Sequence, residues 1–232
     1  MYKRILLKLS GEQLQGKYDS GFDTERAIWI AGEIKKVEAT EIVIMIGGGN
    51  YVRGAQTAGS GIERVTADNM GMLSTLLNAL ALADVFNANG VNARALSSVK
   101  ADQVVDQFTH RRALSHLAKK RVVIVAGGTG RPYLTTDTAA VSFALELDCD
   151  AIFKATKVDG VYNDDPETNP AASKYDTISL QEAVENPAVR VMDKAAIALA
   201  ADHKQSIVVF ELLKENNIAR AAAGEPIGTT VH

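Results

Sequence analysis

The stretch IVIMIGGGNYVRG, residues 42–54, is an apolar run that ends in three glycines and then reaches an arginine. The unbroken apolar run over residues 42–46 predicts a strand covered on both faces, because a strand with one face in water alternates apolar and polar residues. Glycine lacks a Cβ, so another group can approach its backbone within hydrogen-bonding distance. Together with Arg53, the glycines indicate that an anionic group docks where this strand ends.

Similar β-branched runs recur along the chain, and helical patterns separate most of them. The runs lie at residues 4–9, 41–46, 91–96, 121–126, 150–155 and 206–210. Asp23 is a good N-cap for a helix with an apolar face over residues 27–37, and residues 195–201 favour another helix. A less regular helix is predicted over residues 104–117. Apolar strands that alternate with helices predict an α/β fold, with a mostly parallel sheet covered on both faces.

Residues 69–86 differ from the other helical segments because they are apolar on every side. Two stripes lie on opposite sides of this helix: Met70, Leu73, Leu77 and Leu80, and then Met72, Leu76, Ala79 and Leu82. A helix of this kind is expected to be buried all round. Two interpretations stay open, a central helix of one domain or a subunit interface.

Length, composition and charge bound the class of protein. The 232 residues suffice for one large α/β domain or two small ones, and a net charge of −3 argues against a general nucleic-acid binder. No run approaches the roughly 20 apolar residues of a membrane span, and the N-terminal residues predict a strand rather than a signal peptide. Cys149 is the only cysteine. It is predicted to be a small buried hydrophobe, and a reducing cytoplasm fits this cysteine count.

Residues that carry chemistry gather where the predicted strands end, which is where α/β sheets bind their ligands. Lys8 interrupts the first strand and precedes a Ser-Gly pair, although a lysine that reaches water from a strand end explains it as well. Residues 126–140 crowd glycines, threonines and Asp137 before a helix, where N-capping explains only part of the pattern. Lys154 lies inside another strand, followed by an acidic loop.

Lysines and an arginine on different segments, glycine-rich backbone at several strand ends and acidic residues together suit phosphoryl transfer. In that reaction an enzyme mostly positions the reactants and neutralises charge. Other sites are less well supported. The sequence GEQLQGKY, residues 11–18, has the spacing of a P-loop but ends in Tyr18, where Mg²⁺ needs a Ser or Thr. The four histidines lack metal-ligand spacing, and no Ser-His-Asp order or Cys nucleophile competes.

Seven segments, read in order, resemble the bacterial UMP kinases of the amino acid kinase family: KLSGE, GGGNYVRG, ADNMGM, GGTGRPYLTTD, KATKVDGVYNDDP, VMDKAA and GTTV. The likeness runs from Lys3 to Val231. It implies transfer of the ATP γ-phosphoryl group to UMP, giving UDP and ADP, with Mg²⁺ accompanying ATP. It implies a three-layer αβα sandwich around a mostly parallel sheet, as a single domain over residues 1–232. UMP is expected toward the N-terminal part and ATP toward the C-terminal part of a cytoplasmic homohexamer, without a nucleic-acid or membrane partner.

The resemblance also assigns roles to individual residues. The catalytic group it implies is Lys8, Asp137 and Lys154. The ATP-binding residues it implies are Lys8, Leu9, Ser10, Gly11, Gly49, Arg53, Thr156, Tyr162 and Asp165. The UMP-binding residues it implies are Gly48, Asp68, Thr129, Gly130, Arg131, Pro132, Tyr133, Leu134, Thr135 and Thr136. No residue is assigned to a metal, and Asp193 is either a helper of catalysis or a helix N-cap.

Two features separate this chain from parts of that family. Residues 16–23 are shorter than the glycine stretch linked to GTP activation in some members, whereas UTP inhibition is a family expectation. Asn69 follows Asp68 at a position where relatives vary. Two alternatives stay open: another member of the family that phosphorylates a carboxylate or carbamate, and a binding or storage protein on the same scaffold.

Overall fold

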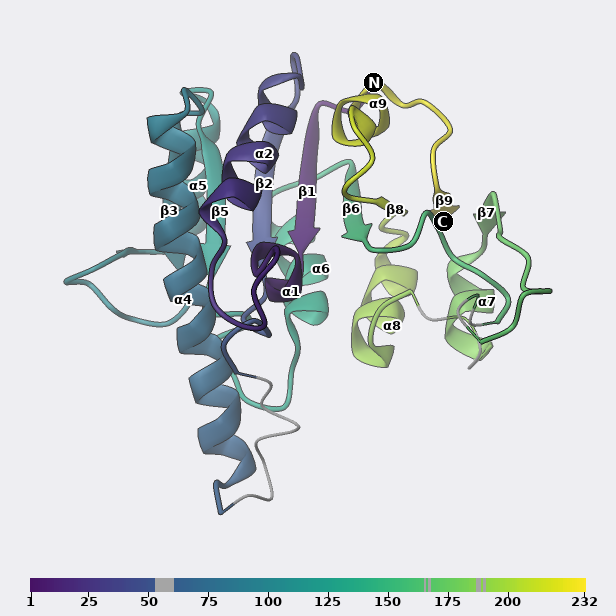
Figure 1. Ribbon diagram of the computed structural model, residues 1–232, viewed down its shortest axis with the longest axis horizontal. Helices are drawn as coiled ribbons and strands as arrows, with labels where there is room; N and C mark the ends of the chain where they lie inside the picture. Colours follow the sequence, from purple (N-terminus) through teal and green to yellow (C-terminus); the bar gives the residue numbers. More distant parts are fainter. Residues whose placement is uncertain (53–60, 165, 167, 187–188, 190) are drawn as a thin grey trace.

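The computed structural model describes residues 1–52, 61–164, 166, 168–186, 189 and 191–232, and Figure 1 shows the arrangement of its elements. The strands are β1 (Arg4–Leu9), β2 (Glu41–Ile46), β3 (Ala93–Ser97), β4 (Asp106–Gln107), β5 (Val122–Ala126), β6 (Ala151–Thr156), β7 (Thr177–Ile178), β8 (Ile207–Glu211) and β9 (Thr229–Val231). The helices are α1 (Gly11–Leu14), α2 (Thr24–Lys35), α4 (Arg64–Ala88), α5 (His110–Leu117), α6 (Thr136–Glu146), α7 (Leu180–Glu185), α8 (Lys194–His203) and α9 (Asn217–Ala223).

The described strands form one sheet in the order β4-β3-β5-β2-β1-β6-β8-β9-β7. Every pairing is parallel except that of β8 with β9, so the predicted mostly parallel sheet is confirmed. The first strand lies between β2 and β6. The chain therefore builds one side of the sheet from its first half and the other side from its second half, and the order reverses at β1.

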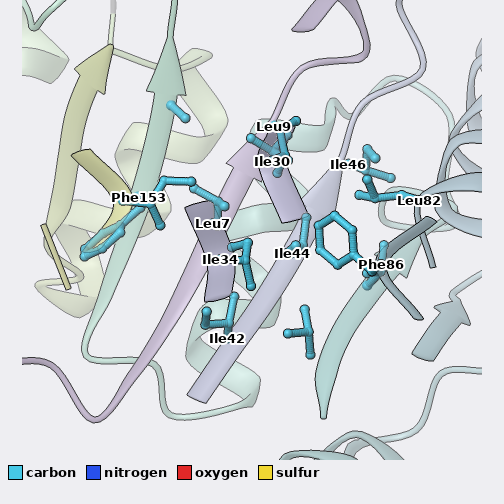
Figure 2. Close-up of a cluster of buried hydrophobic side chains, with 14 of the residues drawn as sticks. Leu7, Leu9, Ile30, Ile34, Ile42, Ile44, Ile46, Leu82, Phe86 and Phe153 are labelled. Carbon is cyan, nitrogen blue, oxygen red and sulfur yellow. The ribbon is translucent and has the colours of Figure 1, made fainter. Parts of the chain in front are cut away.

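Alternation along each strand sends side chains into two separate cores. Ile5, Leu7 and Leu9 join α2, α4 and α9 in one core, which Figure 2 shows around Ile44 and Phe86. The core on the opposite face contains Leu6 and is built with α5, α6, α7 and α8. Because both faces are covered, the strands carry apolar residues at nearly every position, as the sequence pattern predicted.

The beginning of α2 confirms the predicted cap. Asp23 accepts hydrogen bonds from the backbone N–H groups of Glu25 and Arg26, which no earlier turn of the helix can satisfy. Cys149 is buried, as predicted, and burial raises the pKa of its thiol to about 12. That thiol is therefore uncharged at neutral pH and serves as packing.

The helix predicted over residues 104–117 is wrong in its first half. Residues 106–107 pair with β3 as the short edge strand β4, and α5 begins at His110, where Thr109 accepts a hydrogen bond from the backbone N–H of Arg112. Phe108 contacts Phe143 of α6 edge to face, with ring centroids 4.5 Å apart. Its apolar character reflects packing against the next layer rather than a helical face.

The prediction that α4 is buried all round is also wrong for a single chain. Leu76 and Leu82 are buried against the sheet, but Leu73 and Leu77 are 54% and 53% exposed. Within the described residues, α4 is the helix long and apolar enough by length and composition to cross a membrane, with a mean hydropathy of 1.3 in its best window. The same composition suits a core helix, and α4 packs against α2, β3 and β5.

Ile30 and Ile28 provide a direct test of the two faces of α2. Ile30→Ala should lower the free energy of unfolding by about 2–5 kcal/mol, because Ile30 is 0% exposed in the core. Ile28 lies in the same helix but is 44% exposed, so Ile28→Ala should cost less than about 1 kcal/mol. Urea unfolding followed by circular dichroism measures both, and equal losses would contradict this assignment of the faces.

Candidate active site at the carboxyl ends of the strands

Two lysines lie side by side on neighbouring central strands. Lys8 of β1 and Lys154 of β6 are partners in the parallel register. Two residues earlier, Leu6 and Ile152 face the core beneath α6, and strand alternation turns both lysines to that same side. An otherwise apolar face of the sheet therefore ends in two adjacent ammonium groups. Such a pair needs a counter-charge, because like charges at short range in a partly buried site repel strongly.

Asp137 supplies that counter-charge from the first turn of α6. Its Oδ1 lies 2.6 Å from Nζ of Lys8, and its Oδ2 lies 3.0 Å from Nζ of Lys154. Lys154 also donates to the backbone carbonyl of Val191. The three charged side chains are only 11–18% exposed, so protein groups rather than water surround most of the cluster. One carboxylate thus joins β1, β6 and α6.

The electrostatics of this cluster keep Asp137 charged. Burial alone would raise the pKa of its carboxyl, but the ammonium groups of Lys8 and Lys154 outweigh burial and lower that pKa from 3.8 to about 2. Burial lowers the pKa of Lys154, and the charge of Lys8 adds to this effect while Asp137 opposes it. The cluster itself holds two cations and one anion, and the nearby charge of Asp193 also acts on Lys154.

Gly48 and Gly49 of the opening stretch, and Gly11 beside them, are glycines for different physical reasons. A Cβ on Gly48 would lie 2.7 Å from the carbonyl oxygen of Gly71 in α4, and one on Gly11 would lie 2.6 Å from the backbone nitrogen of Gly49. Close packing of backbone on backbone therefore requires glycine at both positions. A Cβ on Gly49 would meet only ordinary contacts with Glu12. Of these glycines, Gly49 best fits the prediction of backbone left bare for a ligand.

A buried amide pair holds this glycine turn against α4. Asn50 and Asn78 exchange two side-chain hydrogen bonds of 2.9 and 2.8 Å, and Asn78 also donates to the carbonyl of Gly47. Both asparagines are buried, so their amides need these partners. Gln13 ties α1 to the end of β6 in a similar way, by donating to the carbonyl of Ala155.

A cavity of about 260 Å³ opens beside the glycine turn and α4. It brings together most of the residues predicted to bind UMP: Gly48, Asp68, Thr129, Arg131, Leu134, Thr135 and Thr136. Gly49, predicted for ATP, also lines it. Gly130, Pro132 and Tyr133 are outside this lining, although the backbone N–H of Tyr133 donates to Asp68. Polar groups from α4 and from the segment before α6 thus converge on one space.

The sequence analysis missed several residues of this cavity. They are Val52, Arg64, Gly71, Met72, Thr75 and Gly128. Four of them lie on α4 at spacings of −4, +3, +4 and +7 from Asp68, which is the period of one helical face. For the three residues that follow Asp68, this periodicity is visible in the sequence, because they fall within the helix predicted over residues 69–86, whereas Arg64 precedes that helix.

Several other residues predicted for ATP lie at or next to the ends of β1 and β6. Lys8 and Leu9 end β1, Ser10 and Gly11 open α1, and Thr156 ends β6. Leu9 is fully buried, so only its backbone can face a ligand.

A second cavity of about 230 Å³ is lined by Thr156 together with Glu12 and Lys157. Tyr162 lies outside that lining, and its hydroxyl donates to Asp159 over 2.6 Å. The predicted residues Arg53 and Asp165 lie outside the described residues.

Asp193 caps a helix and also contacts the segment that carries Asp137. It is the N-cap of α8 and accepts a hydrogen bond from the backbone N–H of Ala196. It also accepts hydrogen bonds from the hydroxyls of Thr135 and Thr138, on either side of Asp137. The capping interpretation is confirmed, and a part in catalysis stays a prediction.

Comparison with known proteins points to one enzyme family. The sequence profile of the Amino acid kinase family matches residues 3–211. A uridylate kinase from Dichelobacter nodosus (strain VCS1703A) is 46% identical over 233 residues, which cover 100% of this chain and 96% of that protein.

Solved structures agree with the sequence comparison. A UMP kinase structure from Bacillus anthracis superposes with a TM-score of 0.95 at 36% identity, covering 100% of this chain and 96% of that one. A UMP kinase structure from Ureaplasma parvum gives a TM-score of 0.92 at 34% identity, with coverage of 100% and 99%. The predicted fold is thereby confirmed.

Replacing Asp137 by asparagine should change how stability depends on pH. The folded pKa of about 2 lies below the unfolded value of 3.8, so the charge of Asp137 stabilises the fold above about pH 4, and this contribution is lost as the pH falls toward 2. Over that interval wild type should lose on the order of 2 kcal/mol more than Asp137→Asn, and the two stability curves should converge.

Urea midpoints between neutral and acidic pH measure this convergence. The control is Asp102→Asn, which alters an exposed carboxylate beside Lys100 and should follow wild type throughout. Parallel curves for wild type and Asp137→Asn would show that the ion pairs to Lys8 and Lys154 do not hold Asp137 charged.

Proposed function

The chain belongs to the amino acid kinase family, and from this premise we propose how its strand-end site works. Its activity is phosphoryl transfer from ATP to UMP, giving UDP and ADP for pyrimidine nucleotide synthesis. The observation that carries the mechanism is the cluster in which one buried carboxylate holds two lysines together. Such a cluster answers the main difficulty of the reaction, which is to bring two anionic phosphates into contact.

The two lysines act as fixed positive charges on the transferring phosphoryl group. Lys8 is proposed to contact ATP phosphate oxygens, and Lys154 to share the charge that builds up between donor and acceptor. Asp137 places both ammonium groups through its ion pairs of 2.6 and 3.0 Å. No general base is required, because the phosphate of UMP is already an anion at neutral pH. The protein contributes position and charge rather than covalent chemistry.

UMP is proposed to occupy the cavity of about 260 Å³, with its ribose at Asp68 and its phosphate toward Gly48 and the lysines. The segment over residues 129–136 forms the opposite wall, as the resemblance implies. ATP is proposed to approach from the second half of the chain, past Gly49 and Thr156. Arg53, Tyr162 and Asp165 remain proposed ATP ligands on the resemblance alone. The proposed arrangement is a single domain over residues 1–232 with one nucleotide on each side of β1.

Mg²⁺ is proposed to enter as part of the ATP substrate. Within the described residues, no group of three His, Cys, Asp or Glu side chains is placed to hold a metal ion. Asp137 is engaged by two lysines, and Asp193 by two threonines and a helix N-terminus. Phosphate oxygens and water, with at most one carboxylate, are the ligands that Mg²⁺ usually keeps in kinases. The ion neutralises phosphate charge when it is bound.

The lysine cluster also bears on the two alternatives from the sequence. A storage protein would not require two partly buried lysines on one carboxylate, because holding them costs desolvation. A kinase for carboxylates or carbamates would share the cluster, but it would not require a ribose-binding acid. Asp68 lines the cavity, and this supports a nucleotide acceptor.

Lys8→Ala should lower kcat by about 10²–10³ while the chain stays folded, because it removes one charge from the transferring group. Lys17→Ala is the matched control, since Lys17 is an exposed lysine that pairs with Glu25. The assay is UDP formation from ATP and UMP, with CMP, acetylglutamate and aspartate as competing acceptors. Near-normal turnover by Lys8→Ala would contradict the role of Lys8, and turnover of an amino acid but not UMP would overturn the proposed acceptor.

A cytoplasmic homohexamer is also proposed, and α4 offers a contact surface for it. Leu73 and Leu77 expose more than half of their side chains on one face of the helix, one turn apart. Apolar side chains exposed in line on a helix favour association with a second copy of the same chain. This supports the subunit-interface interpretation of the second apolar stripe, while the other stripe serves the core.

Replacing both Leu73 and Leu77 by aspartate should dissociate the assembly, because it puts charges into the proposed contact. Sedimentation velocity should give six chains for wild type and fewer for the double variant. Val104→Asp alters a residue that is 62% exposed outside α4 and should leave the assembly intact. A monomeric wild type at micromolar concentration would contradict the proposal.

A further inference from the structure

Arg64 joins the two walls of the cavity proposed for UMP. It is the first residue of α4, and its Nε lies 2.9 Å from each carboxylate oxygen of Asp68, one turn further along. Its guanidinium carbon lies 5.3 Å from the centroid of the Tyr133 ring, which belongs to the facing segment. Asp68 in turn accepts a hydrogen bond of 2.9 Å from the backbone N–H of Tyr133. The three residues form a closed set of contacts that links α4 to the segment before α6.

The backbone of Tyr133 indicates that this set determines the local conformation. Its φ of 68° lies in the left-handed region, which is unfavourable for a non-glycine residue. Its side chain is 65% exposed, so burial of the ring does not offset that cost. The contacts that hold Tyr133 in place are its N–H bond to Asp68 and the stacking of Arg64. Removing Arg64 takes away the side-chain half of this support.

The hydrogen-bonding capacity of Asp68 limits what else it can hold. An ionised carboxylate offers about four lone-pair positions, two on each oxygen. Arg64 uses one on each oxygen, and the N–H of Tyr133 uses a second one on Oδ2. One position remains on Oδ1. Asp68 therefore has room for a single further donor while Arg64 stays in place.

We propose that Arg64 is a positioning residue that fixes Asp68 so that its Oδ1 accepts one ribose hydroxyl of the acceptor nucleotide. The proposal rests on the proposed function, in which Asp68 binds the ribose of UMP. Arg64 lines the cavity as well, but its proposed role is exerted through Asp68 and Tyr133. It holds the carboxylate turned into the cavity, supplies the opposite charge, and keeps the segment of Tyr133 against α4. A preorganised acceptor binds its donor without first losing the freedom of its side chain.

The proposal makes a specific prediction about deoxy analogues. Because Asp68 has one free position, wild type should lose about tenfold or more in kcat/KM with either 2′-deoxy-UMP or 3′-deoxy-UMP, but not equally with both. In Arg64→Ala the KM for UMP should rise, and the kcat/KM values for the two analogues should differ by less than about threefold. The KM for ATP should stay near its wild-type value, since removing uniform acceptor binding leaves the other substrate unaffected.

Two further variants separate geometry from charge and from general damage. Arg64→Lys keeps the charge but cannot span both carboxylate oxygens and the ring with one planar group. Its kcat/KM values for the two analogues should therefore also stay close to each other. Arg220→Ala is the matched control, because Nε of Arg220 lies 2.6 Å from Glu225 in an exposed pair outside the cavity lining. In Arg220→Ala the ratio of kcat/KM between the two analogues should equal the wild-type ratio.

The outcomes are separable because the ratio of kcat/KM between 2′-deoxy-UMP and 3′-deoxy-UMP, called the analogue ratio, is measured within one protein. This ratio does not depend on how much of that protein is folded. Wild-type turnover of UMP reports on the proposed function, and its absence would overturn that function. With wild-type turnover present, an unchanged analogue ratio in Arg64→Ala would overturn the role of Arg64. Equal losses with both analogues in wild type would also overturn it, because a single free position on Asp68 cannot serve two hydroxyls. A wild-type ratio in Arg64→Lys would show that charge alone suffices.

Discussion

The bridge from Asp137 to Lys8 and Lys154 is the interaction on which the rest of the site depends. Two ammonium groups in register on adjacent parallel strands repel each other in a partly buried site, and the carboxylate between them offsets that repulsion. That carboxylate comes from the first turn of α6, so the helix is tied to the two central strands at one point. Within the bridge two cations face one anion, which favours an anionic group such as a phosphate as the ligand.

Sheet topology explains why the structure has a cavity in each half of the sheet around the bridge. The order of strands reverses at β1, so the first half of the chain lies on one side of Lys8 and the second half on the other. Ligands of open α/β sheets bind in the crevice that such a reversal creates. One side has the cavity of Asp68, and the other has the smaller cavity of Thr156.

The candidate site was predictable from local patterns to different extents. Lys8 and Lys154 stood out because a charge inside an apolar strand needs a reason, and Asp137 because it follows a glycine-rich strand end. The glycines were a weaker guide. Gly48 and Gly11 are required by backbone packing against α4 and the neighbouring turn, which leaves Gly49 with the space for a ligand. Composition at a strand end does not distinguish these two uses, because both need the absence of a side chain.

Other features were missed because their cause lies in contacts between distant segments. Phe108 looked like part of a helical face, yet it packs on Phe143 of another layer. The apolar residues of α4 suggested complete burial, but the sheet covers only one side of that helix. Arg64 has an ordinary helical sequence context. It becomes informative only when Tyr133, 69 residues further along the chain, is seen against its guanidinium.

The sequence by itself determined six of the nine described strands, the helices α2, α4, α6 and α8, the parallel sheet and the charged residues at the strand ends. These features depend on the periodicity of apolar residues or on a charged residue inside an apolar run, and both signals lie within a few positions of the chain. Tertiary structure alone decided that Lys8 and Lys154 share one carboxylate, that Asp68 retains one free acceptor position, and which side of α4 faces outward. Each of these depends on which segments become neighbours, and that follows from the order and packing of the whole sheet rather than from any stretch of the chain.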